Sequence, residues 1–186
     1  MGVMTGPVGL LLVDMQEDFF ARDMTPSRDV VISGAAELLH AFRSAGAPVA
    51  HIHTVCAPDG SDAMPHWLPD KMLCVAGTPG VLAPEPLRPE GDEFVAVKQH
   101  YDGFVDPGLE PWLRQHGVET VVVCGVYTQT CVRAAVLGAY QRGFQVVMAT
   151  DALGTDDVEF ANMNLTWLGA RAAKLLDNAA ILETVL

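Results

Sequence analysis

Residues 118–142 read VETVVVCGVYTQTCVRAAVLGAYQR, a stretch that joins two kinds of secondary structure. Its run of valines, which ends at Cys124, is short and β-branched, as is typical of a strand buried on both faces. Gly125 interrupts the run, and from Cys131 onward an alanine-rich segment has helical periodicity. The stretch therefore predicts a strand, a tight turn and a cysteine in the first turn of a helix.

The predicted position of Cys131 has chemical consequences. A helix N-terminus carries a partial positive charge and unpaired backbone N–H groups, so a thiol there is expected to have a lowered pKa and to be partly thiolate near neutral pH. The same N–H groups could hold a developing oxyanion. The alternative is a buried cysteine that serves as a small hydrophobic side chain, which is the commoner fate of an isolated cysteine.

Length and composition favour one domain that covers residues 1–186. The hydrophobic fraction of 50% and the charged fraction of 18% fit a compact α/β protein and exclude a disordered chain. The formal net charge of −12 argues against nucleic acid and against an anionic membrane as partners, because both require clustered lysines and arginines. A small-molecule substrate remains compatible with this charge, since its recognition is local.

The cysteines and the N-terminal stretch bear on the cellular compartment. The cysteines, at positions 56, 74, 124 and 131, form no CxxC pair and have no metal-ligand spacing. Such sparse thiols suit a reducing cytoplasm better than a disulfide scaffold, so we expect a cytoplasmic protein. The apolar stretch near the N-terminus is too short to span a membrane and has no positive flank of the signal-peptide type, and we expect it to be the first strand.

Apolar runs alternate with helical periodicities along the chain. This alternation predicts a single-domain, Rossmann-like α/β fold: a three-layer sandwich with a mostly parallel six-stranded sheet and helices on both faces. The expected strands are residues 8–13, 48–54, 93–97, 118–124, 145–149 and 180–185. The expected helices are residues 29–45, 109–116, the segment from 131, and 158–176. Residues 56–91, rich in proline and glycine, are expected to form a long irregular excursion of the kind used as lids and binding loops.

Three ionisable residues stand at or just beyond the predicted strand ends: Asp14, Lys98 and Cys131. Ligands of open α/β sheets bind outside the carboxyl ends of the strands, where the strand order reverses. If the first and fourth strands are neighbours, Asp14 and Cys131 face one crevice, and Lys98 reaches it from a strand about 10 Å to one side. Asp14 could then take the proton of a nucleophilic Cys131, while Lys98 holds the aspartate. Taken singly, Asp14 could instead cap a helix or pair with an arginine, and Lys98 could be a solvated lysine.

Three motifs, in the same order, resemble those of the isochorismatase-like cysteine hydrolases, the group that includes nicotinamidase and N-carbamoylsarcosine amidohydrolase. They are LLLVDMQEDFF at 10–20, VAVKQHYDGF at 95–104 and CGVYTQTCVRAAVLGAY at 124–140, followed by ATDAL at 149–153. The resemblance implies an enzyme without a cofactor that cleaves a C–N bond of a small amide, ureido or carbamoyl compound through a covalent cysteine intermediate. It also implies a homodimer or homotetramer.

The resemblance assigns catalytic roles to named residues. It implies a triad of Asp14, Lys98 and Cys131. It implies a cis peptide between Val126 and Tyr127, with the backbone N–H groups of Tyr127 and Cys131 as the oxyanion hole.

The resemblance also indicates the substrate pocket. Phe19 stands where family members have an aromatic wall. Tyr101, Phe104 and Tyr127 are further candidates for binding the substrate because they lie close to the motifs, and ordinary core packing is the alternative for them.

The chain differs from nicotinamidases in the residues that would form their metal site. Nicotinamidases hold a metal with an Asp-x-His pair and a later histidine; this chain has His51, His53 and His66 but lacks that aspartate. We therefore expect no metal and regard His53 and His66 as pocket or lid residues, with a nicotinamidase carrying a variant metal site as an alternative. True isochorismatases have a small residue in place of Cys131, which favours the amidase branch. A non-catalytic binding protein and a redox role for Cys131 are the remaining alternatives.

Overall fold

The computed structural model describes residues 6–185 and contains a six-stranded sheet in the order β3-β2-β1-β4-β5-β6. Every neighbouring pair in this sheet is parallel. The strands are β1 (Val8–Val13), β2 (Val49–Thr54), β3 (Phe94–Lys98), β4 (Thr120–Gly125), β5 (Gln145–Leu153) and β6 (Lys174–Leu176). The α/β class and the parallel sheet predicted from the sequence are confirmed.

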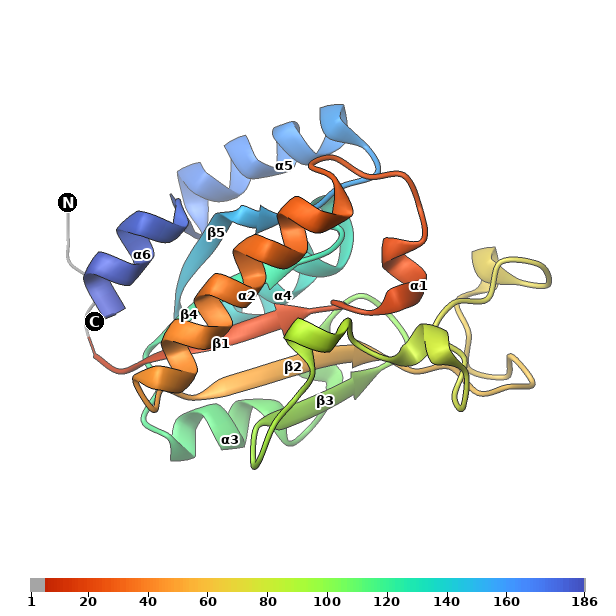
Figure 1. Cartoon of the computed structure of the whole chain (residues 1–186), viewed down its shortest axis with the longest axis horizontal. Coiled ribbons are helices and arrows are strands. Elements are labelled where there is room, and N and C mark those ends of the chain that lie inside the picture. The colour runs from red at the N-terminus through yellow and green to blue at the C-terminus, as the bar shows by residue number, and fades with distance from the viewer. Residues whose placement is uncertain (1–5, 186) are drawn as a thin grey trace.

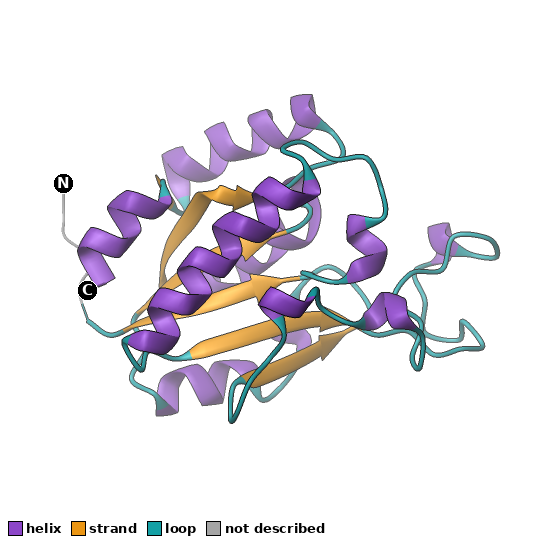
Figure 2. Ribbon diagram, in the orientation of Figure 1, coloured by secondary structure: helices purple, strands orange, loops and turns teal. Residues whose placement is uncertain are grey.

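Helices cover both faces of the sheet, so the fold has three layers (Figures 1 and 2). The helices are α1 (Glu17–Phe20), α2 (Arg28–Ser44), α3 (Leu109–Gln115), α4 (Arg133–Gln141), α5 (Val158–Arg171) and α6 (Asn178–Val185). Two hydrophobic clusters hold the layers together. On one face α2 packs on Leu10 and Leu12, and on the other α3 and α4 pack on Leu11 and Val13. Strand β1 is therefore buried on both sides, which explains its unbroken apolar run.

The strand order reverses between β1 and β4. From β1 the chain moves outward through β2 to β3, then returns to pair β4 with the other side of β1 and continues through β5 to β6. A crevice forms outside the carboxyl ends of the strands at such a switch point. The residues that follow β1 and β4 are thereby placed beside each other, as the sequence predicted.

The segment between β2 and β3 is irregular apart from short 3-10 turns at Pro65–Trp67, Pro79–Val81 and Glu85–Leu87. It extends past the carboxyl ends of the strands on the right of Figure 1. Cys56 anchors its base, since the Cys56 N–H donates to the Cys74 carbonyl at 2.9 Å. The expected long excursion over the strand ends is confirmed.

The C-terminal elements differ from the prediction. The last long helix ends at Arg171, the sixth strand is Lys174–Leu176, and the segment predicted as a strand at 180–185 is helix α6. Periodicity cannot distinguish a short apolar strand from a buried helix segment. The deciding contact is local: the Asp177 carboxylate accepts a hydrogen bond from the Ala180 N–H at 2.8 Å and caps α6 at its N-terminus.

Candidate active site

The ends of β1 and β4 approach each other unusually closely. Asp14 follows β1 with a φ of 51°, in the left-handed region that aspartate tolerates better than most residues, and its N–H donates to the Ile52 carbonyl at 2.8 Å. Gly125 ends β4 with a φ of 136°, and a Cβ at this position would lie 2.1 Å from the Val13 carbonyl oxygen. Only glycine fits there. The interruption that Gly125 makes in the valine run is therefore what brings the two strand ends together.

The Lys98 ammonium group connects the two other predicted catalytic residues. Its Nζ lies 2.8 Å from Oδ2 of Asp14 and 3.5 Å from Sγ of Cys131. It also donates to Oγ1 of Thr54 at 2.7 Å and to the His100 carbonyl at 2.9 Å. Asp14 and Lys98 are fully buried and Cys131 is 5% exposed. The structure thus brings the three residues together, although Lys98 comes from β3, two strands away from β1.

Thr54 and Gln16 belong to the same network, and the sequence analysis missed both. Oγ1 of Thr54 donates to Oδ1 of Asp14 at 2.9 Å while it accepts from Lys98. The Gln16 side-chain amide makes two hydrogen bonds to the Thr54 backbone: it donates to the carbonyl and accepts from the N–H, each at 2.8 Å. A usable signal was present: Thr54 is the last residue of β2, the strand between β1 and β3, so its side chain had to lie between those of Asp14 and Lys98.

The expectation of a lowered pKa for Cys131 is wrong for the protein without a ligand. Burial raises the pKa of the thiol, and the neighbouring Asp14 carboxylate raises it further, against the opposing effect of Lys98. Cys131 lies in a π-helical segment, Thr128–Val132, that leads into α4. Any favourable charge at this helix end is outweighed because the sulfur is enclosed beside an anion. With its pKa raised, the resting thiol is protonated, and its sulfur accepts a hydrogen bond from the Lys98 ammonium at 3.5 Å.

The turn between β4 and the π-helical segment has the geometry that the resemblance implied. The peptide bond between Val126 and Tyr127 is cis. The Tyr127 hydroxyl donates to the Phe19 carbonyl at 2.6 Å, and burial raises the pKa of this phenol to about 12. The Thr128 N–H donates to the Gly154 carbonyl at 2.9 Å. These bonds fix the turn that contains the cis peptide.

A pocket of about 140 Å³ opens over Cys131. Three of the four predicted substrate-binding residues line it: Phe19, Tyr101 and Tyr127. The rings of Phe19 and Tyr127 meet edge to face with centroids 5.9 Å apart, and Trp67 packs against Phe19 at 6.4 Å. The other lining residues, absent from the sequence-based pocket set or foreseen only as loop residues, are Arg22, Met64, His66, Trp67, Leu73, Thr130 and Asp156.

Phe104, the fourth candidate, does not reach the pocket. It is 5% exposed and belongs to the hydrophobic cluster between the sheet and α4. Its ring lies 6.2 Å from that of Phe144, and the Arg142 guanidinium stacks over it at 4.8 Å. The short 3-10 turn Gly103–Val105 directs Phe104 away from Tyr101, so core packing is its role.

The three histidines do not fit a metal. His51 and His53 share a face of β2 with ring centroids 5.9 Å apart, but Nε2 of His51 is hydrogen-bonded to Glu93 at 2.9 Å and the ring is fully buried. His66 lines the pocket beside Cys131 instead, as expected for a loop residue, whereas His53 does not. Between residues 6 and 185, no three His, Cys, Asp or Glu side chains are grouped as metal ligands.

Comparison with known proteins agrees with this geometry. Residues 8–180 match the model of the isochorismatase domain. The chain belongs to the isochorismatase family. Among solved structures, an isochorismatase family protein from Desulfovibrio vulgaris superposes with a TM-score of 0.85 at 29% identity, over 96% of this chain and 98% of that one. The fold and the recognition of the family from three motifs are both confirmed.

Curated relatives include hydrolases and an amidohydrolase. A streptothricin hydrolase from Streptomyces noursei is 35% identical over 170 residues, which cover 87% of this chain and 63% of the relative. The chain spans about half the length, 51%, of a second streptothricin hydrolase. A maleamate amidohydrolase from Pseudomonas putida is 29% identical over 151 residues, which cover 78% of this chain and 71% of the relative. Across the described residues, no helix is both long enough and apolar enough to cross a membrane.

Proposed function

We propose that this protein is a cysteine amidohydrolase that cleaves a C–N bond of a small amide, ureido or carbamoyl compound. The observation that carries the proposal is the buried contact of three groups, in which the Lys98 ammonium lies 2.8 Å from Asp14 and 3.5 Å from the Cys131 sulfur. A nucleophile, a base and a cation that orients the base are the parts that acyl transfer requires. Similarity to the maleamate amidohydrolase supports the same reaction class.

In the proposed mechanism Asp14 acts as the general base. As the Cys131 sulfur attacks the carbonyl carbon, its proton passes to the Asp14 carboxylate, which Lys98 holds on the same side of the site as the sulfur. The backbone N–H groups of Tyr127 and Cys131 stabilise the oxyanion. The C–N bond then breaks, and the leaving nitrogen takes the proton from Asp14. Water, deprotonated by Asp14, attacks the thioester, the C–S bond breaks, and the thiol is restored.

Lys98 keeps the charge balance of the centre during these steps. Burial by itself would lower the pKa of this ammonium, but Asp14 and Cys131 outweigh burial and raise it, so Lys98 stays charged. A permanent cation between base and nucleophile stabilises each in its anionic form in turn. Lys98 is therefore a positioning and charge-balancing residue and not a proton donor.

The pocket limits the size of the group that reaches Cys131. A volume of about 140 Å³ is close to that of an engineered protein cavity, about 150 Å³, that binds benzene. The aromatic walls contributed by Phe19, Trp67 and Tyr127 favour a flat group such as an amide or ureido group. The substrate proposal is therefore a small planar amide, or a larger compound that inserts only its amide end.

The test is ammonia release from a panel of small amides, ureas and N-carbamoyl compounds, with and without a chelator. We expect wild-type turnover that the chelator does not change and a loss of several orders of magnitude in Cys131→Ala. Cys124→Ala is the matched control, because Cys124 is also fully buried but lies within β4 with its thiol on the Leu11 carbonyl. An acyl-enzyme mass on Cys131 would identify the nucleophile. Equal iodoacetamide labelling of all four cysteines would favour a non-catalytic protein.

We also propose a cytoplasmic homo-oligomer. Cys56, Cys74, Cys124 and Cys131 are all free, which suits a reducing compartment. Helix α5 leaves large apolar side chains exposed to solvent, including Met163 at 64%, and such faces commonly mark subunit contacts. Light scattering of the wild type and of a Met163→Glu variant tests this proposal. A wild-type monomer would reject it.

A further inference from the structure

Two basic side chains that line the pockets around Cys131 have no acidic partner. The side chains of Arg22 and Arg133 make no hydrogen bond and no ion pair with any residue between 6 and 185. Elsewhere in the described chain, four arginines are paired with carboxylates, as Arg28 is with Glu17 at 2.6 Å. The others have a different partner: Arg88 donates to the Ala83 carbonyl at 3.5 Å, and Arg171 stacks over the Trp167 ring. That both arginines without a polar or aromatic partner line the site is therefore a feature that needs a reason.

Both arginines line pockets at or beside Cys131. Arg22 lines the pocket of about 140 Å³ that lies over the sulfur, here called the inner chamber. Arg133 lines an adjacent hollow of about 160 Å³, here called the outer chamber. Tyr101 and Thr130 line both chambers and form the partition between them. Tyr101 is 42% exposed.

Asp156 lines the inner chamber and keeps its charge, and neither it nor Asp14 lines the outer chamber. The Asp156 carboxylate accepts a hydrogen bond from Nε2 of Gln129 at 2.7 Å, and Oε1 of Gln129 accepts in turn from Thr155 at 2.7 Å. Asp14 is neutralised by Lys98 in the buried centre. The outer chamber is lined by one cationic side chain, Arg133, and by no carboxylate within the described residues. The unbalanced charge at the far end of the site is therefore positive.

We infer that the substrate is an anionic amide, with its scissile group in the inner chamber over Cys131 and a carboxylate or similar anionic group in the outer chamber beside Arg133. Arg22, which lines the inner chamber, is the second cation and attracts the same charge. This inference rests on the proposed amidase function and adds a substrate class to it. A guanidinium without an internal partner is suited to bind a planar carboxylate with two hydrogen bonds.

The first experiment measures charge preference without requiring hydrolysis. Iodoacetate and iodoacetamide have nearly the same shape and alkylate the same thiol, so the ratio of their rates at Cys131 does not depend on the pKa of that thiol. We expect the rate with iodoacetate divided by the rate with iodoacetamide to be about tenfold higher at Cys131 than for glutathione at low salt. This ratio should fall toward the glutathione value as salt screens the arginines. Peptide mass spectrometry resolves Cys131 from the other three cysteines.

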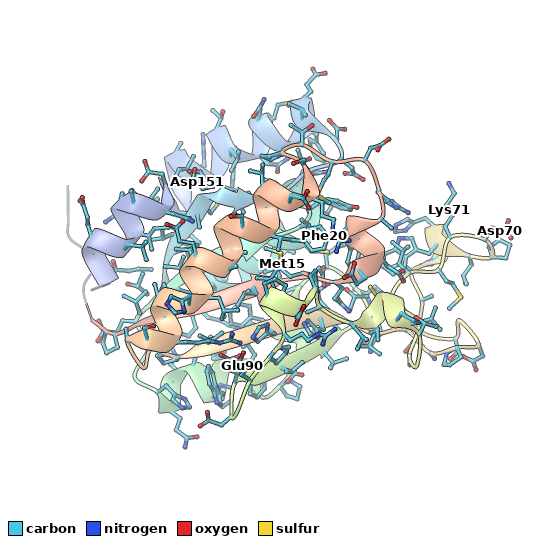
Figure 3. All side chains as sticks on the ribbon, viewed as in Figure 1. Met15, Phe20, Asp70, Lys71, Glu90 and Asp151 are labelled. Carbon is cyan, nitrogen blue, oxygen red and sulfur yellow. The ribbon has the colours of Figure 1, made fainter. Side chains whose placement is uncertain are left out.

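Variants assign the effect to residues. Arg133→Gln and Arg22→Gln should each lower the ratio severalfold, and Asp156→Asn should raise it. Lys71→Gln is the matched control: Lys71 is likewise exposed and without an ion pair, but Figure 3 places it at the outer end of the loop, and it lines neither chamber. Its ratio should equal that of the wild type.

The second experiment uses three amides of similar length: succinamate, which is anionic, pentanamide, which is neutral, and 4-aminobutanamide, which is cationic. We expect kcat/KM to be highest for succinamate, and Arg133→Gln to reduce the succinamate value mainly through a higher KM. Hydrolysis with no preference for succinamate, or a wild-type alkylation ratio equal to that of glutathione, overturns the anionic class but leaves the amidase proposal standing. Absence of hydrolysis of every amide in the panel, together with no alkylation of Cys131 by either reagent, rejects both proposals.

Discussion

Asp14, Thr54 and Lys98 lie at the ends of neighbouring strands, and the polar atoms they point at one another are joined by hydrogen bonds of 2.7 to 2.9 Å. The opposite wall of the same pocket is built differently. Met64 and Trp67 come from the irregular segment between β2 and β3, which is held by turns and by single contacts such as the Asp18 carboxylate on the Cys74 N–H at 2.6 Å.

The contrast separates two tasks. The catalytic centre, here Asp14, Thr54 and Lys98 around Cys131, requires fixed geometry. Proton transfer and nucleophilic attack are sensitive to changes in distance of a few tenths of an ångström, and the sheet supplies the necessary rigidity. The pocket wall formed by Met64 and Trp67 requires a shape that matches one substrate, and a loop can change its shape without disturbing the sheet. Substitutions in the centre should therefore reduce turnover, and substitutions in the wall should change substrate affinity.

The largest expected effect is that of Asp14→Asn. Asparagine keeps the size of the side chain and can still accept from Thr54, but it cannot take the Cys131 proton. We expect kcat to fall by about three orders of magnitude with an unchanged circular dichroism spectrum. Single-turnover kinetics should show that acylation is the step affected. A variant with a kcat within tenfold of the wild-type value would show that Asp14 is not the base. Substitutions in the centre would then affect turnover no more than substitutions in the wall.

Thr54→Val should have the next largest effect. The substitution keeps the β-branched shape but removes the hydroxyl that bridges Asp14 and Lys98, leaving one Asp14 oxygen without that donor. We expect kcat to fall about a hundredfold and the pH dependence of kcat to shift. Thr54→Ser, which keeps the hydroxyl, is the control and should recover most of the rate. Equal losses in both variants would indicate a packing role only.

The contrast extends to the two faces of β2. Thr54 is fully hydrogen-bonded on one face, while Nε2 of His53 on the other is buried without a partner. Burial lowers the pKa of His53 to about 4. Since the unfolded chain binds this proton near pH 6.5 and the folded protein does not, stability is full above pH 6.5 and is lost as the pH falls toward 4.

The expected loss from His53 is about 2 kcal/mol of unfolding free energy between pH 7 and pH 4, allowing for its partial exposure. Urea unfolding across this range measures it. His53→Gln should flatten the pH dependence, whereas His40→Gln, at an exposed position on α2, should follow the wild type. The same slope in all three proteins would show that His53 gains solvent or a partner on protonation.

The smallest effect is expected at the wall. Trp67 is 8% exposed and packs against Phe19. Trp67→Ala should raise KM about fivefold to tenfold with kcat within about threefold, since it removes apolar contact that substrate and transition state share. The KM of Trp67→Phe should lie between those of the wild type and Trp67→Ala. A fall in kcat larger than the rise in KM would show that the wall also positions the reacting group.

The elements that the sequence predicted well are those with strong local signals. The boundaries of β1 agree because an apolar run buried on both faces ends at a charged residue, and α2 was located from its helical periodicity and from the glycine at position 46. The sixth strand and α6 were misassigned because the strand has only three residues and its stability comes from pairing with β5. Pairing between distant residues leaves no local pattern to read.

By itself the sequence determined the family, the parallel sheet and the three residues that meet at its edge, since buried β-branched runs and polar strand ends follow from burial and strand alternation. Tertiary structure decided the rest. It placed Phe104 in the core, inserted Thr54 between Asp14 and Lys98, and raised the pKa of Cys131 where a helix end alone would have lowered it. It also left the side chains of Arg22 and Arg133 lining adjacent chambers without acidic partners. Desolvation and charge proximity cause these differences, and both depend on neighbours far apart in the chain.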